Sequence, residues 1–541
     1  MEPCLPQHDP RPGPRFRRVA AACEAYRYEH QGPIAFLEHL PRRDDFPRSY
    51  RLKRTFTALR FGLDVALVRL QQAWRRPSFE EHARYYPLFR RKPAVIRRFE
   101  DDAVFAWQRV AGANPLDLRR LTEPLPDFPL DDALFAANTR PGSTLAREID
   151  EGRVFAVDHS DLGALSDVVN QRDLQRWLVA PKMLFWYSPD GLLLPVAIQL
   201  QPRPGPDNPI YTPRDGADWR AAKIFAQSGD TTAQEMRHHL AQTHLVLEPV
   251  AIASKRQLAP NHPVRLLLDA HLESLLAIND FGRRTLIAPG GFLDQLMPGW
   301  LSETMQVVGD AVAGWSWRAG GFHEDLEARG LDDLPDGMQA PFRDDGRLVW
   351  DAIHAFVSAY VRLYYGAAED VRLDAELQRF VEEASREGRA RGLPMALHTV
   401  DEVVDLLVRI VWVSGPKHAA VNYAQWDYVA YVPNMPFAMY REPPTGKGAQ
   451  DWTLDALAAA LPAREPTLKQ ILLMEALTGW QHTTLGRYRR GAFRDRRVWP
   501  LVREFQRALA GIEDTIRERD RERLLPYPYL RPSRIPNSTN T

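Results

Sequence analysis

The spacing of apolar and polar residues divides the chain into distinct parts. Residues 1–50 are rich in proline, arginine and aromatic residues and predict an arm on the surface. Residues 182–187 and 192–200 are apolar runs joined by Ser188-Pro-Asp-Gly191, which predicts two strands and a tight turn. From Asp218 onward the spacing is helical almost throughout, interrupted at proline-containing stretches. We therefore expect a mostly α fold with long helices and a small β-hairpin or sheet region.

A further helical pattern lies between Tyr50 and Arg76. The apolar residues on one side of this helix are Leu59, Leu63, Leu67 and Leu70, and many arginines lie on the other side. Such a helix either packs on the core with its arginines in solvent or lies on a membrane surface. The packed helix is the favoured interpretation, and peripheral membrane contact is the alternative.

Two histidines, His239 and His244, lie within the helical pattern of residues 233–253. At five residues apart, they are about 140° out of alignment on an ideal α-helix. Both face one metal only if the helix is locally wider, with i→i+5 hydrogen bonds, and such π-bulges cluster at functional sites. The spacing therefore predicts a π-bulge, while the adjacent His238 points elsewhere.

His418 and Asn422 are four residues apart, so an ordinary helix presents both on one face. A single histidine on an apolar helix is typically a hydrogen-bonded core residue. Three histidines and an amide at these spacings instead favour a six-coordinate transition-metal centre with an open side. Gln425 is placed one turn later to hold the amide of Asn422, and a surface glutamine is the alternative.

Composition excludes several classes of protein. The chain has 541 residues, 45% of them hydrophobic, which is enough for one large helical unit. Its 70 basic and 70 acidic residues give no net charge, so no nucleic-acid partner is expected. Cys4 and Cys23 are too few for a disulfide framework. No apolar run is long enough to span a bilayer and the start does not resemble a signal peptide, so we expect a soluble, cytoplasmic monomer.

Further runs of sequence accompany the histidines. One is His244-Leu-Val-Leu-Glu-Pro-Val-Ala-Ile-Ala-Ser-Lys-Arg-Gln-Leu258, followed by His262-Pro263. The others are residues 219–227, 343–351, 426–427, 432–434, 485–488, 525–530 and the terminal Ile535-Pro-Asn-Ser538. Together they resemble the lipoxygenases, the non-haem iron enzymes that add dioxygen to polyunsaturated fatty acids. The resemblance covers residues 182–541 and implies a catalytic core over 181–541, with 1–180 forming an arm and helices packed on it.

The resemblance assigns a role to each residue of the metal site. It implies that His239, His244 and His418 are ligands, that Asn422 is a weaker ligand, and that the main-chain carboxylate of Thr541 is the fifth. The family usually ends in isoleucine, so the threonine side chain is a departure. The implied metal is one iron per chain, with manganese as the alternative because both accept nitrogen and oxygen ligands in octahedral geometry.

Gly282 and Leu286 are the positions that the resemblance connects with stereochemistry. Glycine at the first position usually accompanies R products and alanine S products, because the missing methyl group opens a pocket for dioxygen. The alternative is that Gly282 only permits close helix packing. Leu286 corresponds to a leucine that walls the reactive carbons and the oxygen path.

Animal and plant lipoxygenases also carry an N-terminal lipid-binding β-sandwich. Residues 1–180 show no succession of short alternating strands. We therefore predict that this domain is missing and that the N-terminal part is helical, as in bacterial-type members.

The resemblance also implies a reaction. A ferric iron accepts an electron and its bound hydroxide accepts a proton, so that a hydrogen atom is removed from the doubly allylic methylene of a fatty acid. Dioxygen then adds to the carbon radical to give a hydroperoxide. This hydroperoxide is R-configured if Gly282 acts as described. No catalytic side chain is needed beyond the metal-bound hydroxide. Apolar residues of 266–310 and 405–435 are expected to line the substrate channel. The alternatives are a hydroperoxide isomerase of the epoxyalcohol synthase type and a non-catalytic lipid-binding relative.

Overall fold

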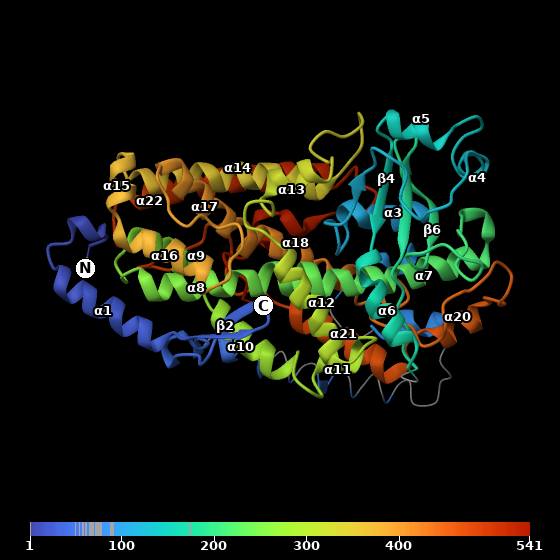
Figure 1. The fold of residues 1–541 in the computed structure, drawn as a ribbon, viewed down its shortest axis with the longest axis horizontal. Coiled ribbons are helices and arrows are strands. Elements are labelled where there is room, and N and C mark those ends of the chain that lie inside the picture. The colour runs from blue at the N-terminus through green and yellow to red at the C-terminus, as the bar shows by residue number, and fades with distance from the viewer. Residues whose placement is uncertain are drawn as a thin grey trace.

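A long helix through the middle of the molecule organises the fold (Figure 1). The computed structural model describes residues 2–48, 50–52, 55–56, 59, 62–63, 66, 70, 78–86, 91–172 and 175–540. The central helix runs from α7 (Ala217–Thr232) through the π-helix η7 (Ala233–Leu245) into α8 (Val246–Gln257). Most of its residues are buried, as expected of a helix surrounded by a large core.

The predicted π-bulge is present and is longer than one turn, since it covers all of η7. Pro249, in the first turns of α8, has no N–H to donate to the carbonyl of Leu245. The regular i→i+4 ladder is therefore interrupted at this junction, where η7 gives way to α8.

A second buried helix crosses the first one and contains a π-turn that the sequence analysis missed. It consists of α17 (Val400–Trp412), the π-turn η8 (Val413–Lys417), α18 (His418–Tyr423) and α19 (Gln425–Tyr428). Pro416 lies inside η8 and cannot donate to the carbonyl of Trp412, which favours the wider turn. As predicted, His418 and Asn422 lie on an ordinary helical segment after this turn.

Other helices surround these two. They are α1 (Pro12–Ala25), α3 (Asp102–Ala111), α4 (Asp132–Asn138), α5 (Leu145–Asp150), α6 (Gly163–Asn170), α9 (Pro263–His271), α10 (Leu275–Thr285), α11 (Phe292–Leu296), α12 (Leu301–Gly314), α13 (Phe322–Ala328), α14 (Pro341–Arg362), α15 (Ala368–Leu373), α16 (Ala375–Arg386), α20 (Leu454–Ala460), α21 (Arg464–Thr478) and α22 (Val498–Arg519). The 3-10 turns are η1 (Pro6–His8), η2 (Arg42–Asp44), η3 (Phe79–Arg84), η4 (Ala94–Arg97), η5 (Ser160–Leu162), η6 (Pro213–Asp215), η9 (Pro528–Leu530) and η10 (Pro532–Arg534). The expected mostly α architecture is confirmed.

Two small antiparallel sheets complete the described part of the fold. One is the hairpin of β1 (Tyr28–Gln31) and β2 (Ile34–Leu37). The other has four strands in the order β3 (Arg119–Arg120), β4 (Val154–Asp158), β5 (Lys182–Tyr187) and β6 (Leu193–Gln199). The predicted hairpin is β5 and β6, and its turn uses Gly191 at φ 79°. This sheet stands at one end of the molecule beside α3 (Figure 1).

The N-terminal part is less purely helical than predicted. In the described part of residues 1–180 there are four short strands as well as helices, and no β-sandwich. β4 is buried almost throughout, so its sequence shows no alternation, and β3 has only two residues. Because β4 pairs with β5, chain on both sides of residue 180 shares one sheet, and the domain boundary at that residue stays a prediction.

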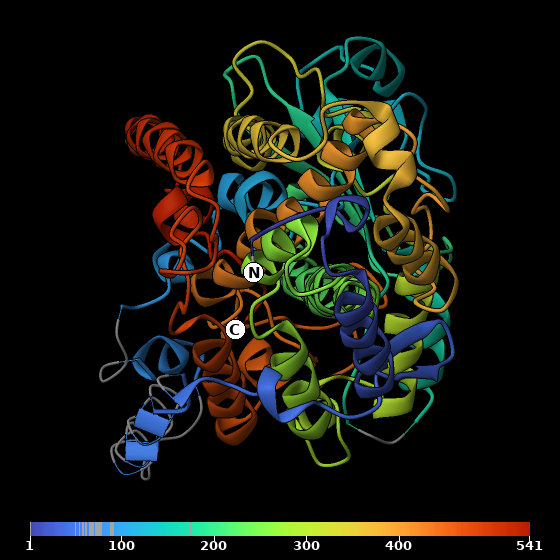
Figure 2. The ribbon, with the colours of Figure 1, turned by 90° about the vertical axis from the view of Figure 1, so that its left-hand side faces the viewer.

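The favoured interpretation of the helix after Tyr50 is wrong for the residues that the structure describes. They are helical, but Leu59 and Leu63 are 62% and 66% exposed instead of packed on the core. Leu67 lies outside the described residues. The described pieces stand at the lower left edge of the molecule in Figure 2. Among the described helices, none has the length and apolar character needed to cross a bilayer.

Candidate metal centre

The π-helix brings His239 and His244 to face His418 across the crossing of the two buried helices. One ligand nitrogen from each ring can be chosen so that all lie within 4.8 Å of one another. The ring centroids are 5.0–5.4 Å apart, and all three side chains are buried. His238 points elsewhere, as predicted, since its Nε2 lies 2.8 Å from a carboxylate oxygen of Asp117.

The three imidazoles are suited to a cation because they are buried and because ring nitrogens of two of them have no hydrogen-bond partner among the described residues. Burial and then the neighbouring His239 lower the pKa of His244 to about 3. Burial and the other two histidines hold the pKa of His418 well below its ordinary value. Among the described residues, nothing hydrogen-bonds to Nε2 of His239 or to either ring nitrogen of His418. Buried polar atoms without partners are costly, and a metal ion at their meeting point satisfies them.

Side chains behind two of the histidines set which ring nitrogen each one presents. The Nδ1 of His239 lies 3.1 Å from Oε2 of Glu235, and the Nδ1 of His244 lies 2.9 Å from Oδ1 of Asn279. A hydrogen bond at Nδ1 leaves Nε2 free to bind a metal and fixes the orientation of the ring. The sequence analysis missed Glu235 and Asn279; the signal for Glu235 was a carboxylate one turn before a ligand.

Gln425 supports a different ligand from the one predicted. It is buried, so the alternative of a surface glutamine is wrong. Its Nε2 donates to Glu235 and lies 3.3 Å from Nδ1 of His239, and it makes no hydrogen bond to Asn422. The amide of Asn422 is instead held by a 2.9 Å hydrogen bond from its Nδ2 to the carbonyl of Leu477. Gln425 thus acts on the site through Glu235, because α19 turns its side chain toward η7.

A second group of side chains also has the residue types of a metal site, namely Asp117, His159 and Asp230. Guanidinium groups already neutralise both carboxylates, with Arg109 at 2.6 Å from Asp230 and Arg237 at 3.0 Å from Asp117. Although burial opposes it, the charges of neighbouring cationic groups hold the pKa of Asp117 well below its ordinary value. This group is therefore an ion-pair network rather than a metal site.

The C-terminal segment is threaded into the core beside these ligands. Residues 537–540 are at most 2% exposed, although chain ends are usually disordered. Asn537 accepts from the backbone of Gly486 and donates to the carbonyl of Arg487, while Thr539 donates to the carbonyl of Ser414 in η8. Thr541, the predicted carboxylate ligand, lies outside the described residues. The carbonyl just before it, on Asn540, accepts a 3.0 Å hydrogen bond from the Tyr50 hydroxyl.

Gly415 permits this close passage of the chain end. A Cβ atom at Gly415 would lie 2.9 Å from the carbonyl oxygen of Pro536 and 3.5 Å from a methyl group of Ile535. A distance below 3.0 Å to a backbone atom cannot be accommodated without a shift of one segment. The π-turn and the chain end are therefore packed as one unit.

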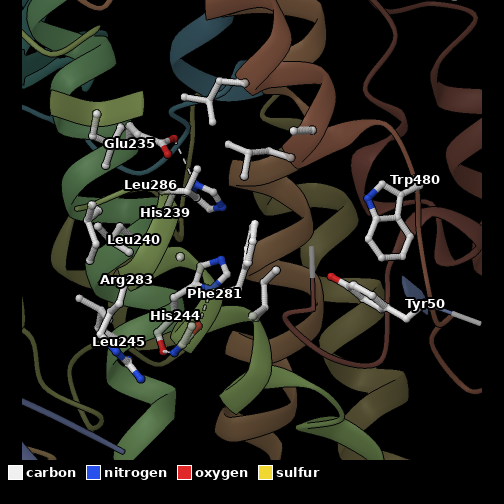
Figure 3. A pocket seen from close by; sticks show the side chains of 18 residues that line it. Tyr50, Glu235, His239, Leu240, His244, Leu245, Phe281, Arg283, Leu286 and Trp480 are labelled. Atoms are coloured by element: carbon white, nitrogen blue, oxygen red, sulfur yellow. Dashed lines mark hydrogen bonds and ion pairs between the residues drawn. The ribbon is translucent and has the colours of Figure 1, made fainter. Parts of the chain in front are cut away.

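An apolar cavity of about 250 Å³ leads to His239 and His244 (Figure 3). Its lining residues are Tyr50, Glu235, His239, Leu240, His244, Leu245, Ile278, Asn279, Phe281, Gly282, Arg283, Leu286, Ile287, Leu293, Leu473, Ala476, Leu477 and Trp480. The expected contribution from residues 266–310 is confirmed. None of these lining residues comes from 405–435, which instead forms the buried helix behind the metal centre. The rest of the wall comes from η7, α21, Tyr50 and Trp480.

Gly282 and Leu286 both line this cavity. Among the described residues, a Cβ atom at Gly282 would meet only the side chain of Leu286, at 4.0 Å. No other described element approaches Gly282, so the described part of the chain gives no support to the alternative that it serves close helix packing. A methyl group at this position would occupy cavity space.

The model of one protein family matches most of the chain. Its description is Lipoxygenase, and the match covers residues 81–526, which include all three histidines. The chain belongs to the lipoxygenase family. The family match extends the resemblance from Lys182 back to residue 81.

Individual relatives agree with this assignment. The lipoxygenase is 34% identical to polyunsaturated fatty acid lipoxygenase ALOX15B of Rattus norvegicus, over 91% of this chain and 72% of the relative. It is 35% identical to a linoleate 9/13-lipoxygenase of Pseudomonas aeruginosa, over 83% and 68%. It is also 34% identical to hydroperoxide isomerase ALOXE3 of Mus musculus, over 82% and 63%. A solved lipoxygenase in complex with arachidonate has a TM-score of 0.93 and 27% identity, over 100% of this chain and 84% of that one.

Proposed function

We propose that this lipoxygenase converts a polyunsaturated fatty acid and dioxygen into a fatty acid hydroperoxide. We also propose that it binds one iron, through His239, His244, His418, Asn422 and the terminal carboxylate of Thr541. The observation that carries the proposal is a set of three buried imidazoles that face one another, two of which, His239 and His244, line an apolar cavity. Bound iron would supply the electron acceptance and the base strength needed to take hydrogen from a methylene between two double bonds.

The side chains of the protein hold the substrate and the ligands in place. The apolar wall formed by residues such as Leu240, Leu286 and Leu473 binds the acyl chain and excludes water from the reacting carbons. Glu235 and Asn279 hold two of the imidazoles by their Nδ1 atoms, so that Nε2 faces the metal. No catalytic acid or base among the side chains is required.

We further propose that Gly282 leaves space for dioxygen at one end of the reacting pentadiene and thereby favours an R product. The proposal is supported by the position of Gly282 in the cavity wall and by the space beside its Cα atom. Leu286, its nearest neighbour there, would limit this space from the other side.

Iron is preferred over manganese on the family assignment, and both suit a site of nitrogen and oxygen ligands. The test is to measure metal content together with conjugated-diene absorbance on linoleate and arachidonate. We expect about one iron per chain, turnover with both fatty acids or one of them, and loss of metal and turnover in His244→Ala. Full turnover with full iron in that variant would overturn the ligand assignment.

The runner-up is a hydroperoxide isomerase, which the relative named ALOXE3 brings into consideration. Oxygen uptake separates the two functions, because isomerisation consumes no dioxygen whereas the proposed reaction consumes one molecule per product. A non-catalytic lipid-binding protein is disfavoured by the presence of all three histidines, and a metal-free protein without turnover would support it.

A further inference from the structure

A buried carboxylate that the proposed mechanism does not use lies one turn after His244. It belongs to Glu248 in α8, which is 0% exposed. Three groups from two other elements donate hydrogen bonds to it. They are the backbone N–H of Leu37 in β2 at 3.0 Å, Nδ2 of Asn279 in α10 at 2.8 Å, and Nη1 of Arg283 in α10 at 3.0 and 2.8 Å from the two oxygens.

Arg283 compensates the charge of Glu248. A buried carboxylate is costly unless it is both paired and hydrogen-bonded, and Nη1 of Arg283 reaches both of its oxygens. Asn279 and Arg283 are four residues apart, so one face of α10 brings an amide and a guanidinium to the same carboxylate. In Figure 3, His244 and Arg283 lie on the same side of the cavity, away from Tyr50. The ion pair therefore lies next to the metal centre.

The carboxylate of Glu248 determines which way the amide of Asn279 points. Nδ2 of Asn279 donates to Oε2 of Glu248 at 2.8 Å and to the carbonyl of His244 at 3.0 Å. The reverse orientation would turn the amide oxygen toward these two acceptors, which is costly in a buried site. The amide oxygen must therefore face the other way, where it lies 2.9 Å from Nδ1 of His244.

The orientation of this amide fixes the tautomer of His244. An amide oxygen only accepts, so Nδ1 of His244 carries the proton and donates, which leaves the lone pair of Nε2 for a metal. A reversed amide would donate to Nδ1, so that the proton would move to Nε2 and block it as a ligand. His239 reaches the same state by a shorter route, because its Nδ1 meets the carboxylate of Glu235 directly.

We propose that Glu248 is a positioning residue of the metal centre: it fixes the amide of Asn279, and through that amide it holds His244 ready to bind iron through Nε2. Because Leu37 donates to the same carboxylate, the hairpin of β1 and β2 is part of this arrangement. The inference rests on the metal site of the proposed function, but not on the reaction. A purely structural role, in which Glu248 and Arg283 only join α8 to α10, is the opposing outcome of the test.

The experiment replaces Glu248 by glutamine, which has nearly the same shape and no charge, in the full iron-loaded protein. The matched control is Glu376→Gln in α16. Glu376 is 4% exposed, accepts two hydrogen bonds from the guanidinium of Arg15 and accepts one from the backbone N–H of Ala259. Both variants remove a buried charge that is paired with an arginine, but only Glu248 is hydrogen-bonded to a side chain that holds a histidine of the metal centre.

We expect Glu248→Gln to lower iron affinity by about 10- to 100-fold in competition with a chelator. Its ferric electron paramagnetic resonance signal should contain a second species, because the amide of Asn279 then occurs in both orientations. Glu376→Gln should keep the wild-type affinity and signal and lower only the melting temperature. Wild-type affinity and signal in Glu248→Gln would overturn the proposal, and so would equal losses of iron affinity in the two variants.

A second variant keeps the test decisive if Glu248→Gln does not fold. Combining Glu248→Gln with Asn279→Asp keeps one carboxylate in the pair and places it against Nδ1 of His244, in the way that Glu235 meets His239. We expect this double variant to bind iron within about tenfold of the wild-type affinity, and a folded double variant without iron would overturn the proposal. If the variants behave as expected but the wild type oxidises no fatty acid, the proposed function is wrong and the positioning role stands.

Discussion

Glu235 places a carboxylate against the imidazole of His239. Its Oε2 is 3.1 Å from Nδ1 of the ligand and also accepts a hydrogen bond from Gln425, so three buried side chains position one another. A carboxylate at Nδ1 strengthens the donor power of Nε2 and fixes the ring orientation. Loss of such a partner typically lowers metal affinity or activity by about 10- to 100-fold.

We therefore expect Glu235→Ala to lower iron affinity and turnover by about 10- to 100-fold. Glu235→Gln should lower both by less, because its amide oxygen still accepts a hydrogen bond from Nδ1 of His239. Iron content after competition with a chelator and turnover on linoleate are the measurements. The control is Gln242→Ala on the same π-helix, whose side chain contacts His238 rather than a ligand. Equal iron retention by Glu235→Ala and the control would refute a positioning role.

Gly282 is the residue at which one methyl group should change the product. Because the added Cβ atom would meet only Leu286 at 4.0 Å, Gly282→Ala should fold normally and remain active. The methyl group would fill part of the proposed oxygen space, so the product should shift from R toward S and to another carbon. Chiral chromatography of the hydroperoxides measures this, and an active variant with an unchanged isomer distribution would show that Gly282 does not direct oxygen.

At the scale of single residues, the sequence predicted the three histidines that the fold brings together, but not the side chains that hold them. The positions of His239, His244 and His418 follow from spacings within single helices, and a five-residue separation itself required the π-bulge. The partners of those rings depend on how helices cross: Gln425 meets Glu235 because α19 packs against η7, and Asn279 reaches His244 from α10. Such contacts between distant segments leave no periodic signal in the chain.

Among the elements, the π-turn η8 connects the His418 helix to the chain end. Gly415 in this turn faces the carbonyl of Pro536, and Ser414 accepts a hydrogen bond from Thr539. The sequence predicted neither this turn nor its contact, since proline within a helix signals a break without saying what passes beside it. The contact matters because residues 535–540 approach the metal centre along this route.

Gly415→Ala should move this segment. The new Cβ atom would lie 2.9 Å from the backbone oxygen of Pro536, so either η8 or the chain end must shift. Small misplacements of reacting groups cost up to about 100-fold in rate, and we expect turnover to fall by about 10- to 100-fold with lower iron content. The control is Gly511→Ala in α22, an exposed helical glycine with nothing within 4 Å of its added Cβ, which should retain full activity and gain slightly in melting temperature. Normal iron content and rate in Gly415→Ala would show that the turn tolerates the displacement.

The helix after Tyr50 shows where the sequence pattern is ambiguous. The same row of apolar residues at helical spacing is produced by a helix packed on the core and by a helix that lies on a membrane, because both need one apolar face. Only the exposure of Leu59 and Leu63 in the folded protein separates the two. The strands β3 and β4 were missed for a related reason, since short or fully buried strands lack the alternation that a sequence reveals.

For the molecule as a whole, Tyr50 of the N-terminal part and the C-terminal segment meet beside the metal centre. Tyr50 from the N-terminal part donates to the carbonyl of Asn540, and residues 535–540 are buried among the segments that carry the ligands. If the carboxylate of Thr541 is the fifth ligand, this burial has a function, because the segment delivers a charged group to a buried site where a bound cation would compensate its charge. Thr541→Ile should then be tolerated or beneficial, since it keeps the carboxylate and adds apolar surface.

A short tag at the C-terminus would convert the carboxylate of Thr541 to a neutral amide and add residues where the preceding segment is 0–2% exposed. We expect iron content to fall and turnover to drop by more than about 100-fold, because a lost ligand costs more than a lost outer partner. The same tag at the N-terminus, where Glu2 is exposed, should leave both unchanged. Iron analysis and conjugated-diene absorbance on the two tagged proteins and the untagged one make the comparison. The carboxylate would be excluded as a ligand if the C-terminally tagged protein kept full iron and oxidised linoleate at the untagged rate. The three histidines and Asn422 would then hold the metal without it.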